Sequence, residues 1–158
     1  MKNKVLLYLS ILFILIWMVI IYSFSDASSD NSNNASKGIV RSIIVFIYKD
    51  KSDKEVEKLV TKYNKPLRKL AHASVYFVLA NFVNSVVCVF KKNKLLLCNI
   101  ISIIICFIYA CTDEWHQTFV MDRSGEFGDV LIDTFGAIIG CLVFNVIYKR
   151  IMKRRESL

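Results

Sequence analysis

Proline and glycine are scarce in this chain, whose 158 residues include one proline and five glycines. A flexible linker or a low-complexity segment would be rich in such residues, so we expect a single folded domain. The cysteines form no C-x-x-C pair, and all lie in or beside apolar runs, at Cys88, Cys98, Cys106, Cys111 and Cys141. Cysteines in such runs act as small buried side chains, and this pattern excludes a disulfide-framed secreted domain.

Charged residues are almost absent from four long segments of the chain. Hydrophobic residues make up 55% of the sequence, which is too apolar for an ordinary soluble domain. Each of the four segments has about 18 or more nearly uncharged residues, the length that a helix needs to cross a bilayer. We therefore predict an all-α integral membrane protein with four transmembrane helices, at residues 5–22, 67–90, 95–112 and 130–148.

The first of these spans has an alternative interpretation as a cleaved signal peptide. Its apolar core is longer than the roughly 7 to 15 residues typical of a cleaved signal, and no Ala-x-Ala site follows it. Lys2 and Lys4 precede the core. We expect an uncleaved first transmembrane helix.

The net charge of +8 is explained by basic residues beside the membrane spans and does not indicate nucleic-acid binding. No basic cluster is interleaved with stacking aromatic residues, so we expect no nucleic-acid partner. Three lysines fill the four-residue turn 91–94, and five basic residues lie in the tail 149–155, whereas the loop 113–129 has one basic and five acidic residues. The positive-inside rule then places both termini and the lysine turn in the cytoplasm, and segments 23–66 and 113–129 outside.

The segment 23–66 has two stretches with helical periodicity that are too short to span a membrane. Residues 36–48 carry five aliphatic side chains at helical spacing, a pattern suited to the membrane interface. A second stretch opens with Ser52 and Glu55 in capping-box spacing, and Pro66 suits the first turn of the next span. We predict two short amphipathic helices in this first outer loop, which cover the outer end of the bundle.

Polar residues within the apolar spans fall on single helical faces, which indicates that they face the protein interior or a wet cavity. In the third span they follow steps of three and four, at Asn99, Ser102, Cys106, Tyr109, Asp113 and His116. Arg68, His72 and Tyr76 do the same in the second span.

The fourth span repeats this arrangement with Asp129, Asp133, Gly136 and Gly140 on one face. The two glycines have the small-xxx-small spacing that lets helices approach closely, either within the chain or between chains. Three helices thus direct ionisable groups into one outward-facing vestibule.

The run Asp113-Glu114-Trp115-His116-Gln117, continued through Arg123 to Asp129 and Asp133, is the strongest local motif. Together with Arg68, His72, the serines at 25, 28, 32 and 36, and the four spans, it resembles the VanZ-like family of bacterial membrane proteins. This resemblance implies a multi-pass protein of the bacterial cytoplasmic membrane that is associated with low-level glycopeptide resistance, to teicoplanin more than to vancomycin. It implies no particular mechanism. The positions that match the family motifs are Arg68, His72, Asp113, Glu114, Gln117, Arg123, Asp129, Asp133 and Gly136, to which we add His116 because it lies one turn from Asp113.

Three interpretations of this ionisable cluster remain open. It can bind a ligand, either a lipid-linked cell-wall precursor or the lipid tail of a lipoglycopeptide, or serve as a structural network in which Arg68 and Arg123 neutralise the carboxylates. It can act on a lipid-linked phosphate or sugar, with His72, Glu114 or Asp113 as catalytic candidates. It can also hold Zn²⁺, Mg²⁺ or Mn²⁺, although no H-E-x-x-H motif is present. We expect a binding or structural site, with enzyme and metal as the alternatives.

Overall fold

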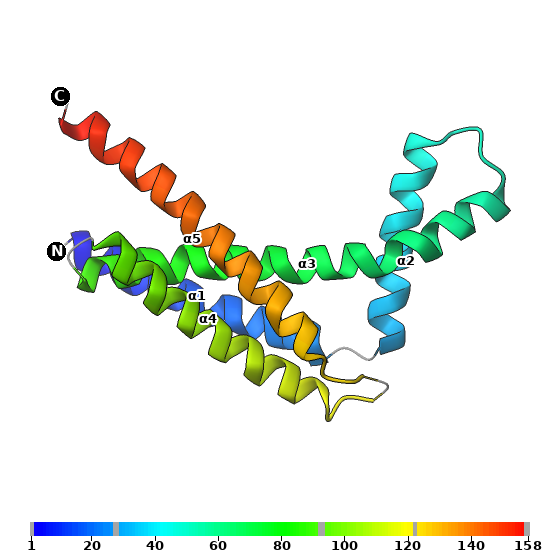
Figure 1. The fold of residues 1–158 in the computed structure, drawn as a ribbon, viewed down its shortest axis with the longest axis horizontal. Coiled ribbons are helices and arrows are strands. Elements are labelled where there is room, and N and C mark those ends of the chain that lie inside the picture. The colour runs from blue at the N-terminus through cyan, green and yellow to red at the C-terminus, as the bar shows by residue number, and fades with distance from the viewer. Residues whose placement is uncertain (1, 27–28, 92–93, 122, 157–158) are drawn as a thin grey trace.

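The computed structural model describes residues 2–26, 29–91, 94–121 and 123–156, which form five α-helices and no strand (Figure 1). The helices are α1 (Lys2–Asp26), α2 (Ser29–Ile47), α3 (Asp53–Phe90), α4 (Leu95–Gln117) and α5 (Phe127–Glu156). All but α2 are long and apolar enough to cross a membrane. The predicted all-α architecture with four membrane-crossing helices is therefore confirmed, and the chain is a multi-pass membrane protein.

The predicted boundary at Pro66 is wrong, because the second amphipathic stretch and the second span form one continuous helix, α3. Its start has the predicted capping box, in which the backbone N–H of Ser52 donates to the Glu55 carboxylate at 3.1 Å. Pro66 has no N–H to donate, so α3 lacks one internal hydrogen bond there and changes direction along its length (Figure 1). Leu59 and Leu67, on either side of Pro66, both pack against the apolar cluster that α2 and α3 share, so packing supports the helix across the proline.

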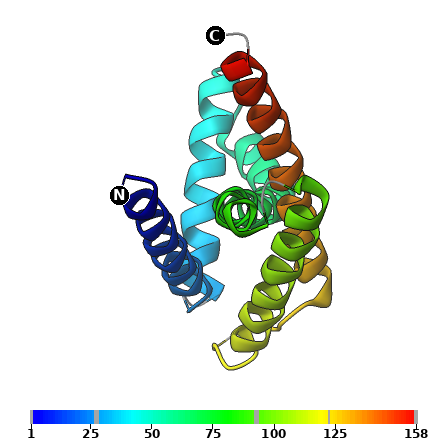
Figure 2. The ribbon, with the colours of Figure 1, turned by 90° about the vertical axis from the view of Figure 1, so that its left-hand side faces the viewer.

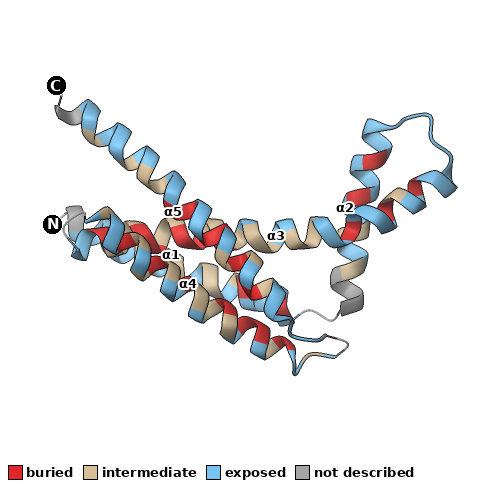
Figure 3. Cartoon of the chain, viewed as in Figure 1, coloured by how far each residue is buried: buried red, intermediate tan, exposed pale blue. Residues whose placement is uncertain are grey.

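Helix α2 and the first turns of α3 form an arm that extends away from the bundle (Figures 1 and 3). Val40 and Ile44 of α2 are buried against Val56 and Val60 of α3. These residues belong to the two predicted amphipathic stretches, and they form the contact between the two helices. The expectation that these helices cover the end of the bundle is wrong for most of their length. Only the first half of α2 reaches the pockets described below.

The remaining helices pack around the long part of α3. Figure 2 looks along this helix, with α1 on one side of it and α4 and α5 on the other. The core between them is made of small and aliphatic side chains together with Tyr76, which is fully buried. Cys88, Cys98, Cys106 and Cys141 are buried as unpaired cysteines, as the sequence predicts.

Gly136 and Gly140 bring α5 directly against the backbone of α3. A Cβ atom added to Gly136 would overlap the carbonyl group of Ala73, and one added to Gly140 would lie 2.5 Å from the carbonyl oxygen of Phe77. The small-xxx-small motif therefore packs two helices within the chain.

The two ends of the bundle differ in character. At the lysine end, α3 joins α4 through the short turn that includes Lys91 and Lys94, and both chain termini lie at this end (Figure 1). At the opposite end, which we call the polar end, α1 and α4 stop and α5 begins. Helices α3 and α4 form an antiparallel hairpin, and the ionisable residues are at the end away from its turn.

Candidate functional site

The polar end contains a pocket whose walls are mostly charged or amide side chains. Asn64, Arg68 and His72 lie one turn apart on α3 and form one wall, while the loop after α4 and the first turn of α5 form another. The pocket has a volume of about 330 Å³. Its lining consists of Asn33, Asn64, Lys65, Arg68, Lys69, His72, Gln117, Arg123, Ser124, Glu126 and Asp129.

A second, apolar pocket of about 450 Å³ adjoins the first. Arg68, His72 and Arg123 line both pockets, so the two spaces meet at these three basic side chains. The remaining walls of the apolar pocket come from α1, α2 and α3, namely Ile21, Phe24, Ala35, Ser36, Ile39, Leu67, Ala71 and Val75. The site therefore has a polar pocket and an apolar pocket that share Arg68, His72 and Arg123.

The two arginines at this junction do not neutralise the nearby carboxylates. Within the described part of the chain, neither Arg68 nor Arg123 forms an ion pair, and Arg123 donates only to the carbonyl oxygen of Phe24, at 3.5 Å. Burial lowers the pKa of Arg123 from its usual value, and the adjacent positive charge of Arg68 lowers it further. Among the described residues Asp113 and Glu114 therefore act on Arg123 electrostatically and not through a direct ion pair, so the guanidinium groups can still contact an anion.

Lys69 is the cation that pairs with a carboxylate at this end. Its ammonium nitrogen lies 2.8 Å from Asp129, and both side chains are about one-third exposed or less. Sixty positions separate the two residues, and no local pattern in the sequence indicates their contact. Asp129 is therefore part of the pocket wall but has its own counter-ion.

Glu114 connects the end of α4 to the loop that precedes α5. Its carboxylate accepts hydrogen bonds from the side chain of Gln117 and from the backbone N–H of Glu126, each at 3.0 Å. Gln117 also donates to the hydroxyl of Ser25 on α1, at 2.7 Å. Gly125 packs against the carbonyl of Glu114, where a larger residue would clash. These contacts favour a positioning role for Glu114, whose carboxylate oxygens are both already engaged.

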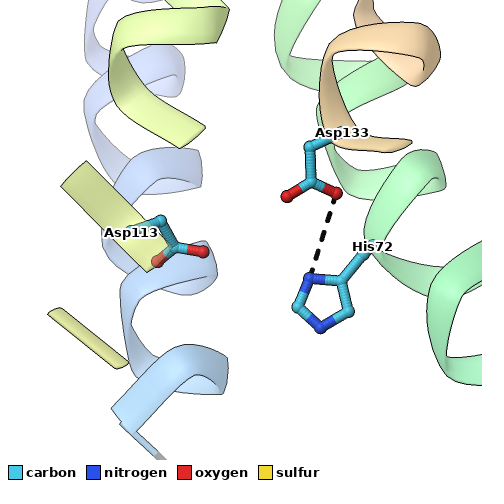
Figure 4. Close-up of side chains that lie close together, drawn as sticks. All are labelled: His72, Asp113 and Asp133. Atoms are coloured by element: carbon cyan, nitrogen blue, oxygen red, sulfur yellow. Dashed lines mark ion pairs between the residues drawn. The ribbon is translucent and has the colours of Figure 1, made fainter. Parts of the chain in front are cut away.

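His72, Asp113 and Asp133 meet in the interior, each from a different helix (Figure 4). One donor atom from each lies within 4.8 Å of the other two, and His72 Nδ1 is 4.0 Å from Asp133 Oδ1. Asp113 is 3% exposed and Asp133 is fully buried. Neither carboxylate accepts a hydrogen bond of ordinary geometry from a described residue, although Ser25 and Gln117 interact with Asp113 and His72 forms a long ion pair with Asp133. This arrangement places two carboxylates in a region where each would normally require a partner.

His116 shares a helical face with Asp113 but does not line the two pockets that His72 lines. Its Nε2 lies 3.3 Å from the carboxylate of Asp26 on α1, and its ring packs against Tyr22 with centroids 4.4 Å apart. It lines a third pocket, together with Asp113 and Tyr22. The two histidines therefore do not share one vestibule.

Six residues of the polar pocket were not identified from the sequence, namely Asn33, Asn64, Lys65, Lys69, Ser124 and Glu126. Asn64 would have been found by extending the second span through Pro66, because Asn64, Arg68 and His72 then fall at steps of four. The serine pattern does not follow one helix, since Ser25 belongs to α1 and Ser36 to α2. Ser36 donates to Asn64 at 2.7 Å, and Ser28 lies outside the described residues.

Comparison with known proteins adds one match. A family model described as VanZ/LLP1 matches residues 10–148, which include the polar-end residues named above. No curated protein and no solved structure matches the chain.

Proposed function

Because this chain belongs to the VanZ/LLP1 family, we propose that it contributes to low-level glycopeptide resistance by binding a lipid-linked cell-wall precursor at its polar end. Such a precursor has a phosphate group attached to a long hydrocarbon chain. A protein that holds it alters the supply of the antibiotic's target without a chemical reaction on the antibiotic.

The observation that carries this proposal is the junction of the two pockets at Arg68, His72 and Arg123. Arginine binds phosphate through paired N–H groups, and hydrogen bonds to charged groups contribute about 1.5–3 kcal/mol each. The adjoining apolar pocket offers a surface for the first part of a hydrocarbon chain. An amphiphilic anion fits both pockets at once, whereas a purely apolar tail would leave the arginines unused.

The orientation of the membrane helices belongs to the same proposal. The lysine turn and the basic C-terminal tail lie at the end away from the pockets, and the positive-inside rule favours the cytoplasm for that end. The polar end then faces outward in the bacterial cytoplasmic membrane, where finished precursors and glycopeptides meet.

An enzyme that acts on the same lipid is the alternative. Its candidates are His72, Asp113 and Glu114, and Glu114 is the least suited to act as a base because Gln117 and Glu126 already engage its carboxylate. A Glu114→Gln variant separates the two cases: it should retain lipid binding in a binding protein but lose turnover if Glu114 is a base.

Lipid binding is tested with the full chain in phosphatidylcholine nanodiscs and a polyprenyl phosphate as the probe, with the matching polyprenol as the phosphate-free reference. We expect Arg68→Gln and Arg123→Gln each to weaken polyprenyl phosphate binding by about 10-fold or more, which is about 1.4 kcal/mol. Arg41→Gln is the matched control, because Arg41 lies on the arm and pairs with Asp53 at 3.5 Å. Equal binding of polyprenol and polyprenyl phosphate would contradict the proposal.

Resistance is tested in a sensitive Gram-positive host that expresses the wild type or these variants at equal membrane levels. We expect the wild type and Arg41→Gln to raise the inhibitory concentration of teicoplanin, and Arg68→Gln to abolish the increase. If the wild type binds the lipid but does not protect, the resistance role is wrong and the binding role stands.

A further inference from the structure

The three residues that meet inside the polar end supply the donor atoms typical of a transition-metal site. His72 offers an imidazole nitrogen from α3, and Asp113 and Asp133 offer carboxylate oxygens from α4 and α5. Their side chains turn toward one shared space in Figure 4. Three protein ligands of these types, each from a different helix, are what a site with open coordination positions requires.

The environment of the two carboxylates independently favours a bound cation. Asp113 and Asp133 are more than nine-tenths buried, and none of their oxygens has a hydrogen-bond partner among the described side chains and backbone groups. Lys69 is engaged by Asp129, and no arginine of the described chain pairs with either residue. A buried, unpaired carboxylate costs several kcal/mol, and two of them side by side repel each other as well. One divalent cation would neutralise both charges.

The helix packing next to the cluster fixes the distance between its ligands. Gly136 lies one turn after Asp133, and its backbone presses against Ala73, the residue that follows His72. The close contact of α3 and α5 at this point keeps His72 and Asp133 opposite each other. A four-coordinate ion with bonds of 2.0–2.2 Å places its ligands roughly 3.4 Å apart, so small side-chain rotations from the present separations of up to 4.8 Å complete the site.

We propose that His72, Asp113 and Asp133 bind one divalent transition-metal ion, of the Zn²⁺ or Mn²⁺ type, at the base of the polar pocket. The mixed imidazole and carboxylate ligands favour these ions over Ca²⁺, which prefers six to eight oxygen ligands. Because His72 also lines both pockets, it connects this site to the space where an anionic ligand would lie.

Tyr76 supports the site from the next turn of α3. It is fully buried, and its hydroxyl has no hydrogen-bond partner within the part of the chain that the structure describes. It interacts electrostatically with both Asp113 and Asp133. With a metal bound, its O–H is a candidate donor to a carboxylate ligand or to a water, the kind of outer contact that orients ligands in metal sites.

The test uses Co²⁺ as a spectroscopic probe, titrated into the metal-stripped full chain in nanodiscs. We expect one Co²⁺ per chain, with visible absorption bands that Zn²⁺ abolishes on displacement. Loss of an outer partner costs about 10–100-fold in affinity, so we expect Asp133→Asn and Asp113→Asn, which lose a direct ligand, to weaken binding by about 100-fold or more. Asp26→Asn is the matched control, since Asp26 also lies beside a histidine but is largely exposed.

Thermal unfolding of the same samples distinguishes metal binding from misfolding. Without metal, Asp133→Asn should unfold at or above the temperature of the wild type, because it removes a buried charge. Zn²⁺ should raise the unfolding temperature of the wild type and of Asp26→Asn but not that of Asp133→Asn. Co²⁺ affinity that is equal in the wild type and Asp133→Asn, or a folded wild type that binds no Co²⁺, overturns the proposal. The lipid measurements use no added metal, so either proposal can fail alone.

Discussion

Two buried polar clusters along α3 differ in how the hydrogen-bonding groups of their side chains are satisfied. Toward the lysine end, Asn84 is fully buried, donates to Asn99 at 3.0 Å and accepts from Ser102 at 3.2 Å. Toward the polar end, Asp113 and Asp133 are equally buried but lack hydrogen bonds from the described chain. The first cluster is neutral and complete within the protein, whereas the second is ionisable and incomplete.

This difference separates architecture from function in a small membrane protein. Neutral amides and hydroxyls that satisfy one another fix which helices pair, and they need nothing further. Carboxylates without such partners are costly in the same surroundings, which agrees with the metal ion proposed above. The Asn84 cluster thus contributes to helix pairing, whereas the His72 cluster is the place where we propose that an ion binds.

The largest effect should come from separating α3 and α5 beside the polar-end cluster. Gly136→Ala places a methyl group against the carbonyl of Ala73, which is backbone and cannot move aside, so we expect a loss of about 3 kcal/mol or more in unfolding free energy, together with loss of Co²⁺ binding. Unfolding with increasing SDS in mixed micelles measures the first quantity. Gly128→Ala is the control, because nothing lies within 4 Å of its added Cβ. If both variants unfold alike, α5 does not depend on this contact.

A smaller effect is expected when the complete cluster loses its central amide. Asn84→Leu leaves Asn99 and Ser102 without their partner, and a buried group left unsatisfied costs about 1–3 kcal/mol. Asp133→Asn, at a position equally buried, should cost less than Asn84→Leu or be neutral, because it removes a charge. The same SDS titration compares the two variants. A larger loss of unfolding free energy for Asp133→Asn than for Asn84→Leu would contradict the proposed difference between the two clusters.

The smallest effect should come from the Asp–His pair that lies outside both clusters. Asp26→Asn removes the partner of His116, but the Asp26 side chain is 62% exposed and such pairs contribute at most about 1 kcal/mol. We expect a change in unfolding free energy within about 0.5 kcal/mol, near the limit of detection. A loss of several kcal/mol would show that α1 is held by this pair.

The features of the fold that depend on one helix at a time were predictable from the sequence. Apolar length gives the four membrane helices, and steps of three and four place Asp113, His72 and Asp133 on inward faces. The prediction at Pro66 was wrong because it used only the local preference of proline for the first turn of a helix. It did not take into account the cluster shared with α2, against which residues before and after Pro66 pack. Tertiary packing overrode a local signal there.

The candidate site was less predictable, because its contacts join residues distant in sequence. The pairing of Lys69 with Asp129 and the placement of His116 beside Asp26 depend on how the helices are arranged around α3. A helical face indicates which residues point inward but not which of two neighbouring helices they meet. For this reason Arg68 and Arg123 were predicted to neutralise carboxylates, and the structure leaves them unpaired.

The length of α3 sets the depth of the site in the bilayer. Eighteen residues separate His72 from Phe90, the last residue of the helix, a distance of about 27 Å at a rise of roughly 1.5 Å per residue. The hydrocarbon layer of a membrane is about 30 Å thick. With Phe90 at one boundary of that layer, His72 lies about 27 Å away along the helix and the arginine one turn before it about 33 Å away, on either side of the opposite boundary. An anionic headgroup could thus reach the site by diffusing within its own leaflet, without its charge ever entering hydrocarbon.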